Sequence, residues 1–159
     1  MVDVARYFLN FLREESCGKC LPCREGIARS LEVLNRICEG KGQPGDIGLL
    51  EELADVLAGF SLCALGQTAA NPVMSTIRYF RDEYEAHVLG HRCPAGVCKA
   101  LITYNIDASK CTGCTACARQ CPQQAISGAK KEPHVIHQSL CIRCGVCLDT
   151  CKFDAVLVQ

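Results

Sequence analysis

Cysteine is the residue type through which this sequence can do most chemistry. The chain has 159 residues, 15 of them cysteines, and most of these cysteines lie in tight runs of three or four. Disulfides within such runs would be strained, the count is odd, and no secretory signal is visible, so a disulfide framework is not expected. Thiolates are soft ligands that select iron–sulfur clusters and zinc. We therefore expect the cysteines to bind metal in a reducing compartment, the cytoplasm.

Two cysteine runs near the C-terminus share the spacing C-x2-C-x2-C-x3-C and begin 30 residues apart. This spacing is typical of bacterial ferredoxins, in which the fourth cysteine of each run binds the other cluster. Residues 102–159 therefore resemble a two-[4Fe–4S] ferredoxin domain, although Lys152 replaces the proline that follows the fourth cysteine. Two zinc sites are the alternative, but zinc modules use cysteine pairs rather than triplets. The resemblance assigns one cluster to Cys111, Cys114, Cys117 and Cys151, and the other to Cys141, Cys144, Cys147 and Cys121.

A third run, between residues 17 and 23, has the spacing CxxCxxC without a nearby fourth cysteine. Its remaining ligand must come from farther along the chain, and Cys63 is the candidate. This pattern resembles the C-terminal helical domain of the NADH-binding flavoprotein subunit of respiratory complex I. It resembles more closely the corresponding subunit of electron-bifurcating and NAD(P)-reducing hydrogenases. The resemblance implies a third [4Fe–4S] cluster that takes electrons from FMN, with the ligands Cys17, Cys20, Cys23 and Cys63.

Three cysteines remain, and one histidine would complete a closed Cys3His zinc site. The segments 83–88 and 93–98 resemble the bridge between the helical bundle and the ferredoxin domain in bifurcating hydrogenase subunits. That resemblance implies a zinc site and favours His87 as its histidine, with His91 as the alternative. The competing interpretations are a buried apolar role for Cys38 and free thiols at Cys93 and Cys98. The expected zinc ligands are Cys38, His87, Cys93 and Cys98. We expect His134 and His137 to be surface loop residues rather than ligands.

The elements that must position these side chains are helices in the first ninety residues. Asp3 is a candidate N-cap, and Asn71 followed by Pro72 is a helix start signal. Apolar residues recur at helical spacing over 4–12, 24–38, 46–59 and 71–88. A strand-like segment, 101–106, precedes the two repeated runs, which form a duplicated unit. We therefore predict an α+β chain: a four-helix bundle with one cluster over 1–89, a linker with zinc over 90–101, and the ferredoxin-like domain over 102–159.

Composition argues against two classes of partner and suggests a third. Lys and Arg together number 17, as do Asp and Glu, so bulk charge does not favour nucleic acid. No apolar run approaches the roughly 18 residues of a membrane span. Residues 99–159 carry seven basic and four acidic side chains, whereas diffusible bacterial ferredoxins are acidic. We predict that this end binds a soluble ferredoxin transiently, with an affinity that salt weakens.

No acid–base or nucleophilic site is evident, so any chemistry would reside in the clusters. The resemblance implies an electron-transfer subunit of a multi-subunit, NAD(P)-linked and electron-bifurcating oxidoreductase of hydrogenase or formate dehydrogenase type, in anaerobic metabolism. This sequence has no glycine-rich nucleotide loop, so FMN and NAD(P) would sit on a partner chain, unless the sequence is an excised portion of a longer one. The subunit would relay single electrons between that flavin and ferredoxin or a further iron–sulfur subunit. An independent diffusible polyferredoxin-like carrier is the alternative, and a zinc-binding assembly module without a redox role is a third interpretation.

Overall fold

The computed structural model describes residues 1–159, and the chain divides into two compact units, Met1–Leu101 and Ile102–Gln159. Each unit has its own buried apolar residues. Residues 90–101, which the sequence predicts to be a linker, are grouped with the first unit. No helix combines the length and the hydropathy that a membrane crossing requires.

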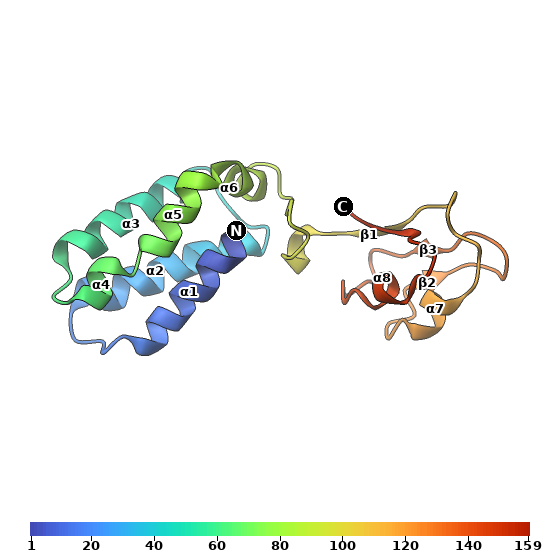
Figure 1. The fold of residues 1–159 in the computed structure, drawn as a ribbon, viewed down its shortest axis with the longest axis horizontal. Coiled ribbons are helices and arrows are strands. Elements are labelled where there is room, and N and C mark those ends of the chain that lie inside the picture. The colour runs from blue at the N-terminus through green and yellow to red at the C-terminus, as the bar shows by residue number, and fades with distance from the viewer. The chain divides into compact units, whose positions relative to one another are not determined.

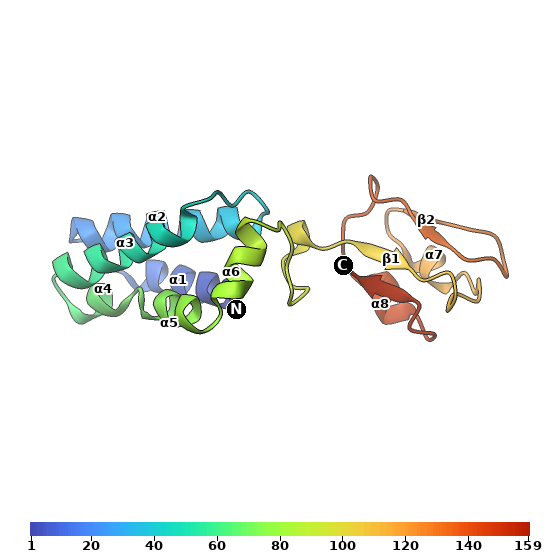
Figure 2. The same ribbon diagram turned by 90° about the horizontal axis from the view of Figure 1, so that it is seen from above.

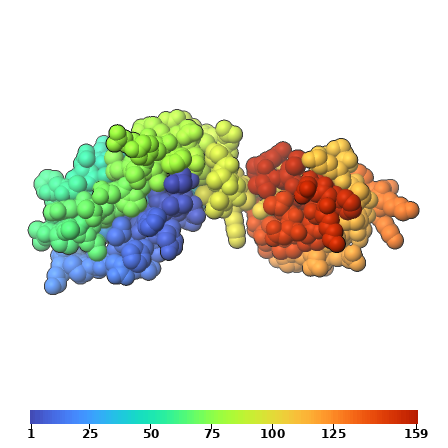
Figure 3. Space-filling view, viewed as in Figure 1, coloured from blue at the N-terminus to red at the C-terminus, as the bar shows by residue number.

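The first unit is helical (Figure 1). Its elements are α1 (Val2–Glu15), α2 (Leu21–Cys38), α3 (Asp46–Phe60), α4 (Ala64–Thr68), α5 (Asn71–Tyr79), α6 (Arg81–Val88) and the 3-10 turn η1 (Lys99–Leu101). α1 packs on α2, α2 packs on α3, and α5 contacts both α1 and α3 (Figure 2). The blue α1 segment lies side by side with the green α5 segment in Figure 3. The core shared by α1, α2, α3 and α5 includes the fully buried side chains of Leu9, Ile27, Leu34, Leu57 and Ile77.

The unit has six helices rather than the four that the spacing predicts. α4 was not predicted, and the expected helix over 71–88 is interrupted at Phe80, whose φ of −136° and ψ of 38° are not helical. The hydroxyls of Thr76 and Tyr84 lie 2.8 Å apart across this break and are hydrogen-bonded in the core. The break therefore changes the direction of the chain while both helices keep a buried face.

The start of α1 also differs from the prediction. The helix begins at Val2 with Met1 at the N-cap position, so Asp3 lies within the first turn instead of capping it. The Asp3 carboxylate forms an ion pair with Arg6 one turn later. The amino group of Met1 pairs with Glu83 of α6, which ties the start of α1 to the end of the helical unit.

The second unit consists of short strands and two short helices. In chain order they are β1 (Tyr104–Ile106), α7 (Ala116–Gln120), β2 (Ile126–Ser127), β3 (Val135–Ile136), α8 (Val146–Thr150) and β4 (Val156–Val158). β1 pairs antiparallel with β4, with Tyr104 opposite Val158 and Ile106 opposite Val156. β2 pairs antiparallel with β3, with Ile126 opposite Ile136.

The order of elements repeats, because a strand, a short helix and a second strand occur twice. The β1–β4 sheet and the β2–β3 sheet each combine one strand from each half, and α7 packs against α8. Neither half therefore completes a sheet or a core by itself. This interlocking brings the two repeated cysteine runs into one small unit.

Candidate metal centres

Two largely enclosed apolar cavities lie in the second unit, and each is lined by four cysteines. The first is lined by Cys111, Cys114, Cys117 and Cys151. The second is lined by Cys121, Cys141, Cys144 and Cys147. Each cavity thus combines the first three cysteines of one run with the fourth cysteine of the other. These are the two sets of four residues that the ferredoxin resemblance assigns to the two clusters.

Local structure explains why the fourth cysteine leaves its own run. The third cysteine of each run, Cys117 or Cys147, lies in the first turn of α7 or α8 and is buried. The fourth, Cys121 or Cys151, follows the end of that short helix with an extended backbone. Each fourth sulfur accepts a backbone hydrogen bond from the residue four positions later, at 3.3 Å and 3.4 Å. The helix therefore separates the fourth thiol from the other three.

The cavities suit thiolates only when positive charge is present. Burial raises the pKa of the Cys117 thiol, and it raises the pKa of Cys147 to about 11. The cause is that a thiolate in an apolar cavity lacks hydration. Iron supplies the compensating charge when a cluster is bound, and four thiolates of this kind are the usual ligands of a [4Fe–4S] cluster.

The third cysteine run surrounds the start of α2. Cys20 is the N-cap residue of α2, and Cys23 lies in its first turn and is 4% exposed. Backbone N–H groups of Leu62 and Cys23 lower the pKa of Cys20, and the Leu62 group is the larger cause. Leu62 directly precedes Cys63, so the loop that carries Cys63 reaches the run. Cys17 and Cys63 are both exposed.

Gly66 permits the close approach of α4 to the start of α2. A Cβ atom at residue 66 would stand 3.1 Å from the Cβ of Cys23 and 2.6 Å from the Oγ of Ser61. The loop between α3 and α4 is closed by a hydrogen bond of 3.0 Å from the Gln67 amide to the Ser61 carbonyl. The structure thus brings the Cys63 loop against Cys20 and Cys23, as a shared cluster would require.

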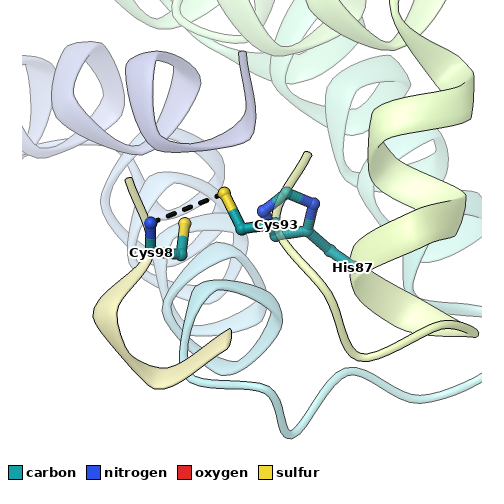
Figure 4. Close-up of side chains that lie close together, drawn as sticks. All are labelled: His87, Cys93 and Cys98. Carbon is teal, nitrogen blue, oxygen red and sulfur yellow. Dashed lines mark hydrogen bonds between the residues drawn. The ribbon is translucent and has the colours of Figure 1, made fainter. Parts of the chain in front are cut away.

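His87, Cys93 and Cys98 lie together in the first unit (Figure 4). The ligand atoms of His87, Cys93 and Cys98 all lie within 4.8 Å of one another. Cys98 also belongs to a second group of this kind, with Cys38 and Asp3. Tetrahedral zinc with bonds of about 2.3 Å holds neighbouring sulfurs about 3.8 Å apart, so this spacing suits a single ion.

The His87 ring has the orientation of a metal ligand. His87 is 1% exposed, and its Nδ1 lies 2.6 Å from the carbonyl oxygen of Glu83. A carbonyl only accepts hydrogen bonds, so Nδ1 carries the hydrogen and Nε2 of the neutral ring keeps its lone pair. Nε2 is buried without a hydrogen-bond partner. His91, the alternative ligand, is exposed and lies outside both groups.

The pKa values of two of the thiols are shifted in opposite directions. A hydrogen bond between Cys38 and Cys98 is the largest cause of the lowered pKa of Cys38. The same hydrogen bond, followed by burial, raises the pKa of Cys98 to about 12. Cys38 therefore becomes a thiolate first, and a divalent ion would displace the remaining thiol proton. These residues suit a zinc ion. Asp3 is an alternative ligand, because its carboxylate forms the second group with Cys38 and Cys98.

One buried side chain near the clusters was not predicted. His134 is 2% exposed and lines the first cavity with its four cysteines, so the expectation of a surface loop residue is wrong. The strand β3 begins at the next residue, and Gly128, which follows β2, lies against the ring. His137 is exposed as expected, and its Nε2 is hydrogen-bonded to the Ser127 hydroxyl at 2.7 Å. The 30-residue repeat is the sequence signal that could have found His134, because it aligns His134 with strand residue Tyr104.

Family models match both parts of the chain that contain the cysteine runs. The family described as NADH-ubiquinone oxidoreductase-F iron-sulfur binding region matches residues 3–87, and the 4Fe-4S dicluster domain matches residues 103–152. Over 159 residues the chain is 52% identical to the NADP-reducing hydrogenase subunit HndC of Solidesulfovibrio fructosivorans. Over 94 residues, 59% of the chain, it is 48% identical to the F-type chain of the NADH-quinone oxidoreductase of Streptomyces coelicolor.

Solved structures of NAD+-reducing [NiFe]-hydrogenase are also similar. The air-oxidized form matches with a TM-score of 0.53 and 32% identity, over 55% of this chain and 15% of that chain. The H2-reduced form matches with a TM-score of 0.52 and 27% identity, over 79% of this chain and 21% of that chain. The present chain spans 32% of the length of HndC and 21% of the length of the Streptomyces relative.

Proposed function

This chain belongs to the family of the NADH-ubiquinone oxidoreductase-F iron-sulfur binding region, followed by a 4Fe-4S dicluster domain, and from that premise we propose that it relays single electrons through three [4Fe–4S] clusters within a multi-subunit, NAD(P)-linked oxidoreductase. The chain itself is an iron–sulfur electron-transfer region. Its own residues would hold the clusters, exclude water from them and set their positions, while the clusters supply the one-electron chemistry when bound.

The exchange of the fourth cysteines between the two cavities carries this proposal. Each cavity has four thiols and an otherwise mainly apolar lining, which favours a buried cluster over exposed metal. The proposed ligands are Cys111, Cys114, Cys117 and Cys151 in the first cavity, and Cys121, Cys141, Cys144 and Cys147 in the second. Because the interlocked strands hold both cavities in one compact unit, the arrangement suits transfer between neighbouring clusters.

The third cluster would be held at the start of α2 by Cys17, Cys20, Cys23 and Cys63. The contact of the Leu62 amide with Cys20 and the close approach of Gly66 to Cys23 support this set. The positive end of the α2 dipole favours the negative charge of a cluster there. In this proposal, electrons pass between this site and a flavin outside the described chain.

The partners are proposed from the relatives. One relative is named as an NADP-reducing hydrogenase subunit and another as part of an NADH-quinone oxidoreductase, which supports an assembly with FMN- and NAD(P)-binding parts. Further subunits of hydrogenase or formate dehydrogenase type, electron bifurcation, and a cytoplasmic, anaerobic setting belong to the same proposal.

A soluble ferredoxin is the proposed partner at the basic C-terminal unit. This unit, residues 102–159, carries six basic and four acidic side chains before the charge of any cluster is counted, and the basic side chains would attract an acidic surface. We expect the rate of ferredoxin reduction by the assembled complex to fall as ionic strength rises. A rate that does not depend on salt would contradict this docking site.

A structural zinc ion is proposed for Cys38, His87, Cys93 and Cys98. Zinc has no redox chemistry, so its role would be to fix the segment after α6 against the helical core. The unpartnered Nε2 of His87 beside Cys93 and Cys98 supports this site most directly.

Metal analysis tests the whole assignment. After anaerobic purification with its natural partners retained, we expect about 12 iron, about 12 sulfide and about 1 zinc to be attributable to this chain. About 8 iron would confine clusters to the second unit and would contradict the site at the start of α2. An iron content near zero would refute the proposed electron-transfer function.

A further inference from the structure

Five side chains of the first unit form two overlapping groups of potential metal ligands. The ligand atoms of His87, Cys93 and Cys98 lie within 4.8 Å of one another, and those of Asp3, Cys38 and Cys98 do so as well. Cys98 is the member that the two groups share. An ion could therefore pass from one group to the other while it stays bound to the Cys98 sulfur.

The two groups differ in their access to solvent. The imidazole and the three thiols are all buried: His87, Cys38, Cys93 and Cys98. Asp3 keeps 36% of its side chain exposed, although its carboxylate lies close to the sulfurs of Cys38 and Cys98. A cation that approaches from solvent would thus meet the Asp3 carboxylate before it meets any buried ligand. Without such a residue, zinc would reach the thiols only when the packing around them opens.

The Asp3 carboxylate is placed beside the thiols by the first turn of α1, but it is not locked there. Its Oδ1 forms an ion pair with Arg6, one turn later in the same helix. The Arg6 side chain is itself largely open to solvent. Ion pairs with this much exposure are weak, because water screens them. A divalent ion can therefore displace the guanidinium group from the carboxylate.

We propose that Asp3, Cys38 and Cys98 form an entry site that captures a zinc ion from solvent and passes it to His87 and Cys93. This inference rests on the proposed function, since it requires the structural zinc ion. Carboxylate, thiolate and imidazole are all ordinary ligands of zinc.

The transfer is an exchange of ligands in which no electron moves. At the entry site Asp3 provides a carboxylate oxygen, while Cys38 and Cys98 each provide a sulfur and release a proton to solvent. His87 then provides its unprotonated Nε2, and Cys93 provides its sulfur and releases its proton. Asp3 gives up its bond to the ion in this step and returns to Arg6. The entry site thus differs from the final site in one respect, because a half-exposed carboxylate takes the place of buried donors.

Exchange of the bound zinc for isotopically labelled zinc tests this inference in the loaded 159-residue chain. Because binding and release follow the same route, loss of the entry ligand should slow both. Loss of one group beside a metal site commonly changes metal binding about 10- to 100-fold, so we expect Asp3→Asn to slow exchange at least about tenfold. Its zinc content should stay at about one per chain, as a single Cys3His site requires. Asp3→Glu keeps the carboxylate and should restore most of the wild-type rate.

Asp82→Asn is the matched control, because Asp82 also lies in the first turn of a helix but is exposed and belongs to neither group. It should exchange zinc at the wild-type rate. If Asp3→Asn exchanges zinc as fast as the wild type, the inference is wrong while the proposed zinc site stands. If Asp3→Asn loses its zinc, the inference is also wrong, because Asp3 would then be a permanent ligand. A wild-type chain that contains no zinc would overturn both the inference and the proposed zinc site.

Discussion

Gly66→Ala is the substitution that most sharply separates the helical cluster site from the ferredoxin-like unit. The new methyl group would stand 2.6 Å from the Cβ and Oγ of Ser61 and 3.1 Å from the Cβ of Cys23. Ser61 and Cys23 are 5% and 4% exposed, so neither can move aside into solvent. α4 would therefore be pushed away from α2, and Cys63 would move away from the other three thiols.

The size of the effect follows from overpacking. An extra methyl group in a packed region costs about 1–3 kcal/mol. At about 1.4 kcal/mol for each factor of ten, this is a roughly 5- to 150-fold weakening of the closed arrangement. We expect about four of the roughly 12 irons to be lost selectively to a chelator, while the eight or so irons of the second unit remain bound.

The assay is iron retained per chain after anaerobic incubation with a chelator, followed over time. Gly59→Ala is the matched control, because Gly59 lies in α3 and a Cβ atom there would meet nothing within 4 Å. Alanine at such a helical position stabilises by about 0.5–1 kcal/mol. If Gly66→Ala retained all its iron as well as the wild type and Gly59→Ala do, the placement of Cys63 in a cluster site would be refuted.

Three further predictions test other parts of the molecule. Asp46→Asn removes a carboxylate that is 3% exposed and ion-paired with Arg36 across the α2–α3 junction, and should lower the free energy of unfolding in urea by about 2 kcal/mol. Glu51→Gln, which removes an exposed ion pair with Arg81, should lower it by less than about 1 kcal/mol. Equal losses in the two variants would contradict the burial argument. Cys93→Ser should weaken zinc binding at least about tenfold with iron unchanged, whereas His91→Ala should leave zinc in place; zinc loss in the His91 variant would reverse the ligand choice. Burial raises the pKa of Tyr84 to about 12 from the ordinary 10.0, so its contribution to stability is complete below pH 10 and is lost as pH rises towards 12. Tyr84→Phe should flatten the stability profile in that range, and an unchanged slope would exclude this cause.

The cysteine pattern was the most informative part of the sequence, because metal ligands must follow local spacing. The resemblance drawn from it to the hydrogenase and complex I flavoprotein subunits is confirmed by the matching families and relatives. The exchange of Cys121 and Cys151 between cavities could be expected only through the resemblance to bacterial two-cluster ferredoxins, since no local periodicity contains it.

The helical details were predicted less completely. Phe80 continues the apolar spacing of its neighbours, so the pattern alone predicts one helix over 71–88. The structure shows a break instead, with a buried hydrogen bond between Thr76 and Tyr84 across it, which the apolar spacing does not reveal. α4 has five residues, too few to display a helical period.

Single-residue burial was hardest to foresee. His134 precedes a two-residue strand in a loop that is otherwise polar, so its composition indicates an exposed site. It is buried because Gly128 and the Glu132 backbone pack around the ring. His87 and His91, by contrast, could be told apart only by the family resemblance in the sequence, and the structure separates them by burial.

Counting the electrons that the chain accepts tests the central claim most directly. The loaded 159-residue chain would be titrated anaerobically with a strong one-electron reductant while its visible absorption is followed. The account predicts about three electrons per chain, one for each [4Fe–4S] cluster, with about two of them retained when Cys63 is replaced by serine. A chain that contains its full iron but accepts no electrons, or one in which Cys63→Ser still accepts three, would contradict it.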